Sequence, residues 1–206
     1  MSRFKKFLLA IAAGICIAVG GTVFLSVENK VVGSVLFAVG LYAIVVNGLY
    51  LFTGKIGYVV VERSGSYAVD LVLTWLGNLL GTGLAALAIG ASRISGISQK
   101  AAALCETKNN DTPFSIFFLS FFCGLLMFVA VDGYKQKQQP LILLMCVSVF
   151  ILCGFEHCVA NMFYYSVSGA WSLKAFAYLL IMTLGNGIGG ILIPSIGLIK
   201  EKKTRA

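Results

Sequence analysis

The long apolar runs of this chain limit its possible folds more than any other feature of the sequence. Phe7–Leu25, Leu71–Ala91 and Phe114–Val131 contain no charged residue. Each run is long enough to cross the hydrocarbon core of a bilayer as an α-helix, which takes about 20 mainly apolar residues. Only helices and closed barrels satisfy every backbone polar group within lipid. Because the runs are continuous and do not alternate between apolar and polar residues, they predict a helical bundle and not a β-barrel.

The composition supports an integral membrane protein. Hydrophobic residues make up 59% of the 206 residues, charged residues make up only 12%, and the mean hydropathy is +0.93. A soluble domain is typically about 25% charged, so this chain cannot cover itself with polar surface. At about 20 residues for each span, roughly six helices fit with short loops. We therefore expect an all-α membrane protein with a single transmembrane domain over residues 1–206.

One of the expected spans is unusually long. It holds three glycines near its centre, Gly48, Gly54 and Gly57. Such a run predicts a second helix that is broken inside the membrane, with irregular backbone lining a cavity. The fifth span is expected to loosen around Tyr165–Gly169. The six spans are Phe7–Leu25, Val31–Val61, Leu71–Ala91, Phe114–Val131, a run starting at Leu141, and Phe176–Ile199 with Pro194 late in it, and the polar stretch Ser92–Pro113 separates the third from the fourth.

The basic residues predict the orientation of the chain in the cytoplasmic membrane. With both termini in the cytoplasm, ten of the sixteen Lys and Arg residues lie inside and five lie outside, which obeys the positive-inside rule. This bias accounts for the net charge of +8 without a nucleic-acid partner. The remaining residue, Lys55, falls at the expected break. The cytoplasmic set is Arg3, Lys5, Lys6, Arg63, Lys135, Lys137, Lys200, Lys202, Lys203 and Arg205, and the outer set is Lys30, Arg93, Lys100, Lys108 and Lys174.

An internal repeat relates the two halves of the chain, at about residues 6–92 and 113–199. Leu76–Gly81 matches Leu184–Gly189, which makes Asn78 and Asn186 equivalent structural polar residues. Three spans in each half is an odd number, so the halves must have opposite orientations. Inverted repeats with paired broken helices place the permeation site near the membrane midplane. The first and fourth spans align in the same way through Phe7, Leu9 and Gly14 with Phe117, Leu119 and Gly124.

The fifth span carries Glu156 and His157, the latter being the only histidine of the sequence. An ionisable group at the centre of a bilayer span costs about 2.5–3.5 kcal/mol on insertion scales, so such groups are rare and usually mark a substrate path. The alternative is a pair that satisfies each other or nearby backbone and holds the helices together.

No motif in the sequence indicates an enzyme, a cofactor or a metal site. A single histidine and the absence of a CxxC pair give no zinc spacing. The sequence also lacks an HExxH motif and a nucleophile elbow. We therefore expect no catalytic residue and no bound cofactor. Five of the six cysteines lie in apolar runs and are interpreted as small packing residues, namely Cys16, Cys123, Cys146, Cys153 and Cys158.

Several motifs resemble those of the formate/nitrite transporter family. The strongest is Gly-Phe-Glu-His-x-x-Ala-Asn-Met-Phe at Gly154–Phe163, because few families place Glu-His in an apolar helix before Ala-Asn-Met-Phe. Weaker matches are Leu51–Gly54 in the second span, Leu184–Asn186 in the last span and Lys6–Ile11 in the first. The resemblance extends from Lys6 to about Ile199.

The resemblance implies an aquaporin-like six-helix protomer in a homopentamer, with one pore in each protomer. Such proteins pass small monovalent anions or their conjugate acids, among them formate, nitrite, acetate, lactate and hydrosulfide. Under this resemblance His157 is the central pore histidine, Thr53 is its partner, and Asn161 and Glu156 support the half-helices. The inner hydrophobic constriction is assigned to Phe37, Leu41 and Phe150, the outer one to Leu51, and the anion-attracting vestibule lysines are Lys6 and Lys108.

Two positions depart from the family pattern. Many members carry a pore asparagine in the fourth span where this chain has Leu125. The pore is then more apolar, which keeps nitrite and hydrosulfide open beside formate. Lys55 is unusual so close to the break, where it either raises the local anion density or extends its head to an interface.

The residues suggest a mechanism for a passive, pH-sensitive pore. A bare anion pays a large desolvation penalty at an apolar constriction, whereas its neutral acid pays little. Mouth lysines and the positive ends of half-helices concentrate the anion. It then takes a proton from solvent or from His157, since an imidazole titrates near physiological pH.

Three alternatives come from other classes of protein. An intramembrane enzyme would use Glu156 and His157 as an acid/base pair but lacks a second catalytic group. A secondary transporter coupled to Na⁺ or H⁺ would share the inverted repeat but would usually carry more midplane carboxylates. A structural or sensory protein would have no reason to break two helices at matched positions.

Overall fold

The computed structural model describes residues 1–204, and it describes the side chains of residues 1–198. Arg205 and the side chains of Lys200, Lys202 and Lys203, all assigned above to the cytoplasmic set, lie outside the described parts. Every regular element of the described chain is a helix. The elements are α1 (Arg3–Ser26), α2 (Lys30–Val46), α3 (Phe52–Lys55), η1 (Ile56–Tyr58), α4 (Val59–Glu62), α5 (Gly65–Gly90), α6 (Ile97–Asn109), α7 (Pro113–Lys137), α8 (Pro140–Leu152), α9 (Cys158–Ser168) and α10 (Leu173–Thr204).

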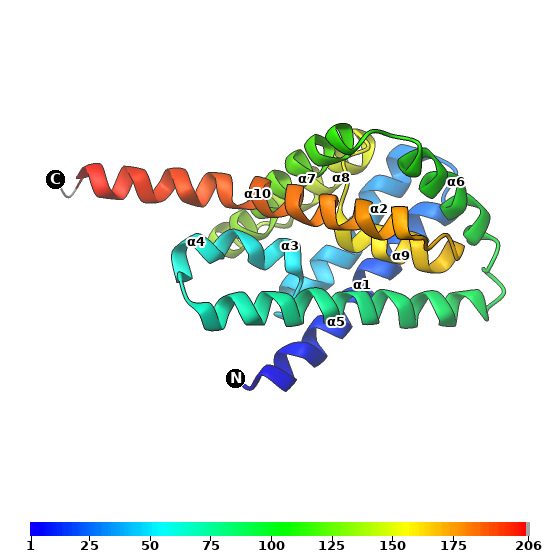
Figure 1. Cartoon of the computed structure of the whole chain (residues 1–206), viewed down its shortest axis with the longest axis horizontal. Coiled ribbons are helices and arrows are strands. Elements are labelled where there is room, and N and C mark those ends of the chain that lie inside the picture. The colour runs from blue at the N-terminus through cyan, green and yellow to red at the C-terminus, as the bar shows by residue number, and fades with distance from the viewer. Residues whose placement is uncertain (205–206) are drawn as a thin grey trace.

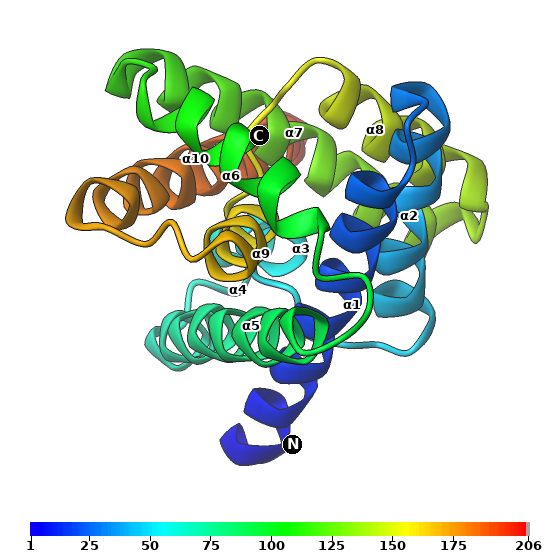
Figure 2. The same ribbon diagram turned by 90° about the vertical axis from the view of Figure 1, so that its right-hand side faces the viewer.

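Four helices are long and apolar enough to cross a membrane in one piece, namely α1, α5, α7 and residues Leu173–Leu198 of α10. The apolar helices α2 and α8 are shorter, and each is followed by a break and a further helical segment. The four continuous and two interrupted spans agree with the six expected. In Figure 2 the short helix α3 and the helix α9 lie in the middle, with α1, α5, α7 and α10 around them.

The two breaks have matching geometry. The first covers residues 47–51 and the second residues 153–157. Each contains a glycine with a positive φ angle, which residues other than glycine rarely adopt. The angle is 61° at Gly48 and 71° at Gly154. Leu51 and His157 then occupy the same position in the two halves, the N-cap position of the following helix, and of the two only His157 makes a capping bond with its side chain.

The expected position of the fifth-span irregularity was wrong. The chain is helical from Cys158 to Ser168 and therefore does not loosen over Tyr165–Gly169 beyond the normal helix end at Gly169. The irregular segment lies on the N-terminal side of His157 instead. The stretch Ser92–Pro113, expected only to be polar, contains the helix α6.

Two of the three second-span glycines, Gly54 and Gly57, lie within helical segments and allow close packing. Gly54 lies within α3 and Gly57 within η1. A Cβ atom on Gly57 would lie only 2.7 Å from the carbonyl oxygen of Gly190 on α10, and one on Gly54 would lie 3.2 Å from Val131. These glycines allow the short helices to approach α7 and α10 closely.

Two asparagines hold the ends of the breaks. Asn78 accepts a hydrogen bond from the backbone N–H of Phe52 (2.9 Å) and donates to the carbonyls of Ala10 (2.8 Å) and Tyr50 (2.9 Å). Each bond links α5 to a neighbouring backbone segment.

Asn186 makes the equivalent three hydrogen bonds in the second half. It accepts from the N–H of Cys158 (2.8 Å) and donates to the carbonyls of Ser120 (2.7 Å) and Glu156 (2.8 Å). Both asparagine side chains are fully buried. The matched Leu-Gly-Asn motifs of the sequence thus make equivalent contacts in the two halves.

Small residues bring the long helices into backbone contact at two crossings. A Cβ atom on Gly81 of α5 would overlap the carbonyl oxygen of Ile11 on α1, and one on Gly189 of α10 would overlap that of Phe121 on α7. Because both obstacles are backbone atoms, a side chain cannot be accommodated by a rotamer change. In Figure 1, α5 and α10 run along the horizontal axis, and each packs against one of the two other long helices, α5 against α1 and α10 against α7.

We expect Gly81→Ala to destabilise the protein and Gly83→Ala, on the same helix, to leave it nearly unchanged. A Cβ atom at position 83 would meet no heavy atom within 4 Å. Overpacking typically costs about 1–3 kcal/mol, and the measurement is thermal unfolding of the purified variants in detergent. Equal melting temperatures for the two variants would contradict the backbone contact.

Candidate functional site

His157 lies at the start of α9 and caps it. The backbone N–H of Ala160 donates a hydrogen bond to Nδ1 of the imidazole at 3.0 Å. A nitrogen that accepts this bond carries no proton, so the single proton of the neutral ring is on Nε2. Nε2 lies 2.8 Å from Oγ1 of Thr53 and therefore donates to it. Both residues are buried, with exposed fractions of 2% for His157 and 0% for Thr53.

This contact joins the two broken helices. Thr53 belongs to α3, the segment after the first break, and His157 follows directly on the second. The pairing of these two residues, expected from the resemblance, is present in the structure although 104 positions separate them in the sequence. Among the described side chains, this is the one hydroxyl group within hydrogen-bond distance of the imidazole.

Apolar side chains close the space around this pair. Phe37 of α2 meets Phe150 of α8 edge to face, with ring centroids 6.0 Å apart, and Phe150 stacks on the imidazole of His157 at 5.8 Å. Leu41 and Leu51 are each only 1% exposed. We call Phe37, Leu41, Leu51 and Phe150 the neck residues.

Two cavities approach this region from opposite ends of α2. The Lys108 vestibule has a volume of about 110 Å³ and its wall includes Lys30 at the start of α2, together with Phe150 and His157. A small cavity of about 40 Å³ at the other end of α2 is lined by Ile44, Leu51 and Lys55 among others. The remaining lining residues of the Lys108 vestibule include Phe24, Leu104, Lys108, Ile151, Gly154, Phe155, Glu156, Ala160, Asn161 and Tyr164.

The expected sides of the constrictions are therefore not consistent with the expected outer side of Lys108. Phe150, assigned to the inner side, lines the Lys108 vestibule, which was assigned to the outer side. Leu51, assigned to the outer side, lines a cavity with Lys55 and Lys135. Motif matching named the four neck residues as the constrictions, but the side of His157 on which each lies depends on how the two breaks fold back.

Glu156 is held in a buried polar cluster. Lys108 Nζ lies 2.7 Å from Oε1 and 2.6 Å from Oε2 of the carboxylate, and Asn161 Nδ2 donates to Oε2 at 2.8 Å. The side chains of Lys108 and Glu156 are 14% and 5% exposed. Lys108 is thus paired with a carboxylate at the base of α9, and its charge is largely neutralised there.

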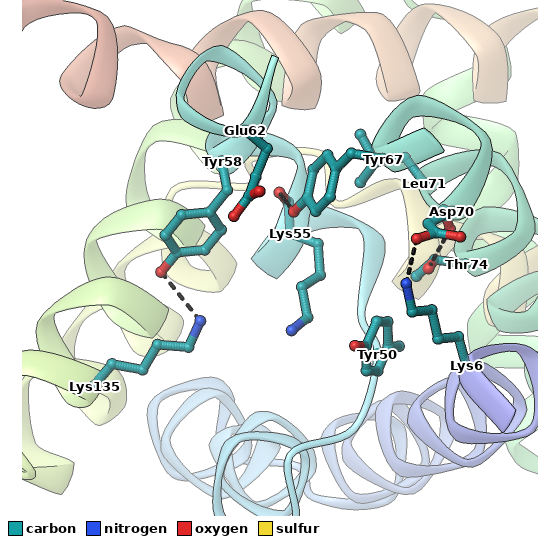
Figure 3. Close-up of a pocket in the computed structure, with 10 residues that line it drawn as sticks. All are labelled: Lys6, Tyr50, Lys55, Tyr58, Glu62, Tyr67, Asp70, Leu71, Thr74 and Lys135. Carbon is teal, nitrogen blue, oxygen red and sulfur yellow. Dashed lines mark hydrogen bonds and ion pairs between the residues drawn. The ribbon is translucent and has the colours of Figure 1, made fainter. Parts of the chain in front are cut away.

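A larger cavity, the Lys55 vestibule, opens beside α3 and has a volume of about 340 Å³. Lys6 makes an ion pair with the buried carboxylate of Asp70 on its wall, and Arg3 lies 3.5 Å from the same carboxylate. The second vestibule lysine of the resemblance is therefore also paired. Figure 3 shows the lining residues Lys6, Tyr50, Lys55, Tyr58, Glu62, Tyr67, Asp70, Leu71, Thr74 and Lys135.

Leu125 does not line the Lys108 vestibule, whose wall includes His157. It is half-buried on α7, and its backbone nitrogen faces Gly189 of α10, where a Cβ atom would lie 3.0 Å away. It is absent from the walls of the two vestibules and of the small cavity. Its proposed effect on the polarity of the pore is not supported by a direct contact with the site.

Sequence reasoning missed several residues of the Lys55 vestibule. Asp70 is one of only eight acidic residues and directly precedes an apolar span, which was an available signal for a buried partner of Lys6. Tyr50, Tyr58 and Lys135 have no such signal, because a tyrosine or lysine near the end of a span is ordinary at a membrane interface.

The sequence matches the family model described as formate/nitrite transporter over residues 1–199. The relatives include the formate channel FocA of Haemophilus influenzae, 29% identical over 184 residues, which cover 78% of this chain and 65% of that protein. The formate channel FocA of Escherichia coli (strain K12) is 30% identical, with coverages of 77% and 64%. The nitrite transporter NirC of Salmonella typhimurium is 27% identical, with coverages of 84% and 71%. The chain thus spans just under two thirds of the length of these formate channels.

Two solved structures share the fold. One, a pentameric formate channel with formate bound, has a TM-score of 0.80 and 23% identity and covers 97% of each chain. The other, an ion channel of the FNT family, also has a TM-score of 0.80, with 24% identity and coverages of 97% and 89%.

The buried pair of Lys108 and Glu156 gives a stability prediction. Lys108→Met should be strongly destabilising, because it leaves a buried carboxylate without its cation, and breaking such a pair typically costs about 3–5 kcal/mol. Adding Glu156→Gln to this variant should recover much of the loss, since the neutral amide needs no counter-charge. Thermal unfolding of the two single variants and the double variant measures the coupling, and additive losses would contradict the pairing.

Proposed function

The chain belongs to the formate/nitrite transporter family, and from this premise we propose that it is a passive, pH-sensitive pore for small monovalent anions such as formate and nitrite, or for their conjugate acids. One observation carries the proposal. The imidazole of His157 meets the hydroxyl of Thr53 at the junction of two broken helices, with a cavity toward either end of the bundle.

The neck residues make the pore selective for the neutral form of the substrate. All four are at most 3% exposed, so the described conformation is closed on both sides of His157. A bare anion would lose its hydration among these apolar side chains without gaining a partner, which is costly, whereas the protonated acid is not charged. The substrate therefore takes up a proton in a vestibule before it passes the neck.

His157 supplies a hydrogen bond to the substrate and not the proton itself. Its only proton in this conformation is on Nε2, and loss of that proton would leave an imidazolate. A second proton could bind only at Nδ1, where it would displace the N–H of Ala160 and remove the cap of α9. It would also place a positive charge at the positive end of a helix. The ring therefore stays neutral and caps α9 while Nε2–H donates to the substrate, and the pH dependence of the flux comes from protonation of the substrate.

We further propose that the protein is a homopentamer in the cytoplasmic membrane, with both termini in the cytoplasm and no enzymatic activity. The pentamer is supported by the likeness in fold to a solved formate channel that is pentameric. The orientation is supported by the excess of basic residues on the side of the termini. In this orientation the Lys55 vestibule faces the cytoplasm and the Lys108 vestibule faces outward.

Transport into proteoliposomes tests the proposed function. Uptake of formate, nitrite and hydrosulfide should be measured between about pH 5 and 8 without an imposed ion gradient. We expect fast flux of formate or nitrite that equilibrates without accumulation and increases as the pH falls. Absence of flux for all three with intact protein, or accumulation against a gradient, would overturn the passive pore.

The capping role of His157 predicts different results for two substitutions. Asparagine is a good N-cap residue, so His157→Asn should keep α9 capped while removing the titratable ring. We expect it to keep the pH profile of the wild type, because in both proteins the flux follows pH through protonation of the substrate. His157→Ala should in addition lower stability by about 0.5–2 kcal/mol through loss of the cap. A pH profile of His157→Asn that differs from that of the wild type would refute this account of the pH dependence.

A further inference from the structure

The charge of the Lys55 vestibule does not come from the lysine that the family resemblance indicates. Lys6 is paired with Asp70, whose carboxylate also lies near Arg3. Two other ammonium groups, those of Lys55 and Lys135, face the same cavity. Neither makes an ion pair with a carboxylate among the described side chains (residues 1–198). These two groups are the cations available to an anion there.

Lys55 is fixed on its backbone and on its side chain. The hydroxyl of Tyr67 donates to the carbonyl oxygen of Lys55 at 2.7 Å, and the ammonium group lies 4.3 Å from the centroid of the Tyr50 ring. In Figure 3 the side chain points away from Glu62, toward the space between Lys135 and Tyr50. Lys55 is half-buried, and its ammonium group is aimed into the cavity.

Lys135 is oriented from the other side of the cavity. Its ammonium group donates to the hydroxyl of Tyr58 at 3.1 Å and lies 4.4 Å from the centroid of that ring. The hydroxyl of Tyr58 in turn donates to Asp132 at 2.9 Å. Asp132 thus fixes the tyrosine that positions Lys135, while two of the three ammonium hydrogens remain free for another acceptor.

The two lysines also connect the vestibule to the neck. Lys55 and Lys135 are the residues shared by the wall of the Lys55 vestibule and by the wall of the small cavity that contains Leu51. An anion between them would lie at the last polar position before the neck. The vestibule of about 340 Å³ has room for a small anion with water, since a water molecule occupies about 30 Å³ in the liquid.

We propose that Lys55 and Lys135 form a binding site for a small oxyanion, which holds the substrate with one oxygen on each ammonium group before it passes Leu51. This inference rests on the proposed function, because capture at this position serves transport. The proposed site would also distinguish monovalent from divalent oxyanions. A monovalent carboxylate can be neutralised there by one proton and move on, whereas a divalent oxyanion such as sulfate is held more firmly and cannot enter the neck.

Anion binding to the purified protein tests the site independently of transport. Thermal unfolding should be followed with increasing sodium sulfate or sodium formate against sodium chloride at equal ionic strength, since a ligand of the folded state raises the melting temperature. We expect a concentration-dependent shift for the wild type, and loss of most of it in Lys55→Met and Lys135→Met. Lys55→Arg should keep it, and so should Lys137→Met, which removes a lysine of α7 that does not line the cavity. An unchanged shift in both Met variants would overturn the site.

Transport measurements give the second test. Transport should be measured in membrane vesicles with the Lys55 vestibule facing the added substrate. The double variant Lys55→Met/Lys135→Met should need about ten times more formate for half-maximal flux, with little change in maximal flux. Sulfate on that side should inhibit the wild type competitively, and sulfate on the other side should not. If the wild type binds sulfate but transports none of the tested anions, the proposed function fails and the site stands. If transport is normal and both variants behave as wild type, the site fails alone.

Discussion

The hydrogen bonds of two buried asparagines are the interaction on which the rest of this structure depends. A helix that stops within a bilayer exposes backbone N–H and C=O groups for which lipid offers no partner. Asn78 and Asn186 each bond one N–H at the start of a half-helix, one carbonyl within the break and one carbonyl of a neighbouring long helix. Loss of one such side chain would orphan several buried groups at once, at about 1–3 kcal/mol for each. The position of Thr53 opposite His157 depends on both sets.

The sequence was informative where a single chemical constraint acts. Six spans and a break in the second could be predicted because lipid tolerates few other arrangements of these residues, whereas the partnership of His157 with Thr53 was predicted from the resemblance to the family. The prediction that three glycines break the second span was correct only for Gly48, which lies in the break. Gly54 and Gly57 allow close helix packing instead. A glycine in an apolar run is compatible with either role, and only the neighbouring helix decides between them. The proposed repeat boundaries stay a prediction.

The charges of the site were the least predictable part. Lysines are expected at both mouths, but whether a lysine acts as a free cation depends on a carboxylate that is distant in the sequence. Lys6 and Asp70 are separated by 64 positions, and Lys108 and Glu156 by 48. Both pairs stabilise helix contacts in a medium where an isolated charge is costly. In our proposal the electrostatic attraction of substrate falls to residues such as Lys55, for which the sequence left two roles open.

The double contact of Phe150 links the width of the neck to the hydration of the histidine. Its ring meets Phe37 across the constriction and also covers the imidazole of His157. A rotation of Phe150 that widened the passage would uncover the imidazole at the same time, and water from the Lys108 vestibule would reach it. The dielectric environment of the ring would therefore change with each opening. In the proposed pore, opening of the neck and hydration of the ring would thus be one event, and a ring that is dry when the neck is closed would not stay dry when the neck opens.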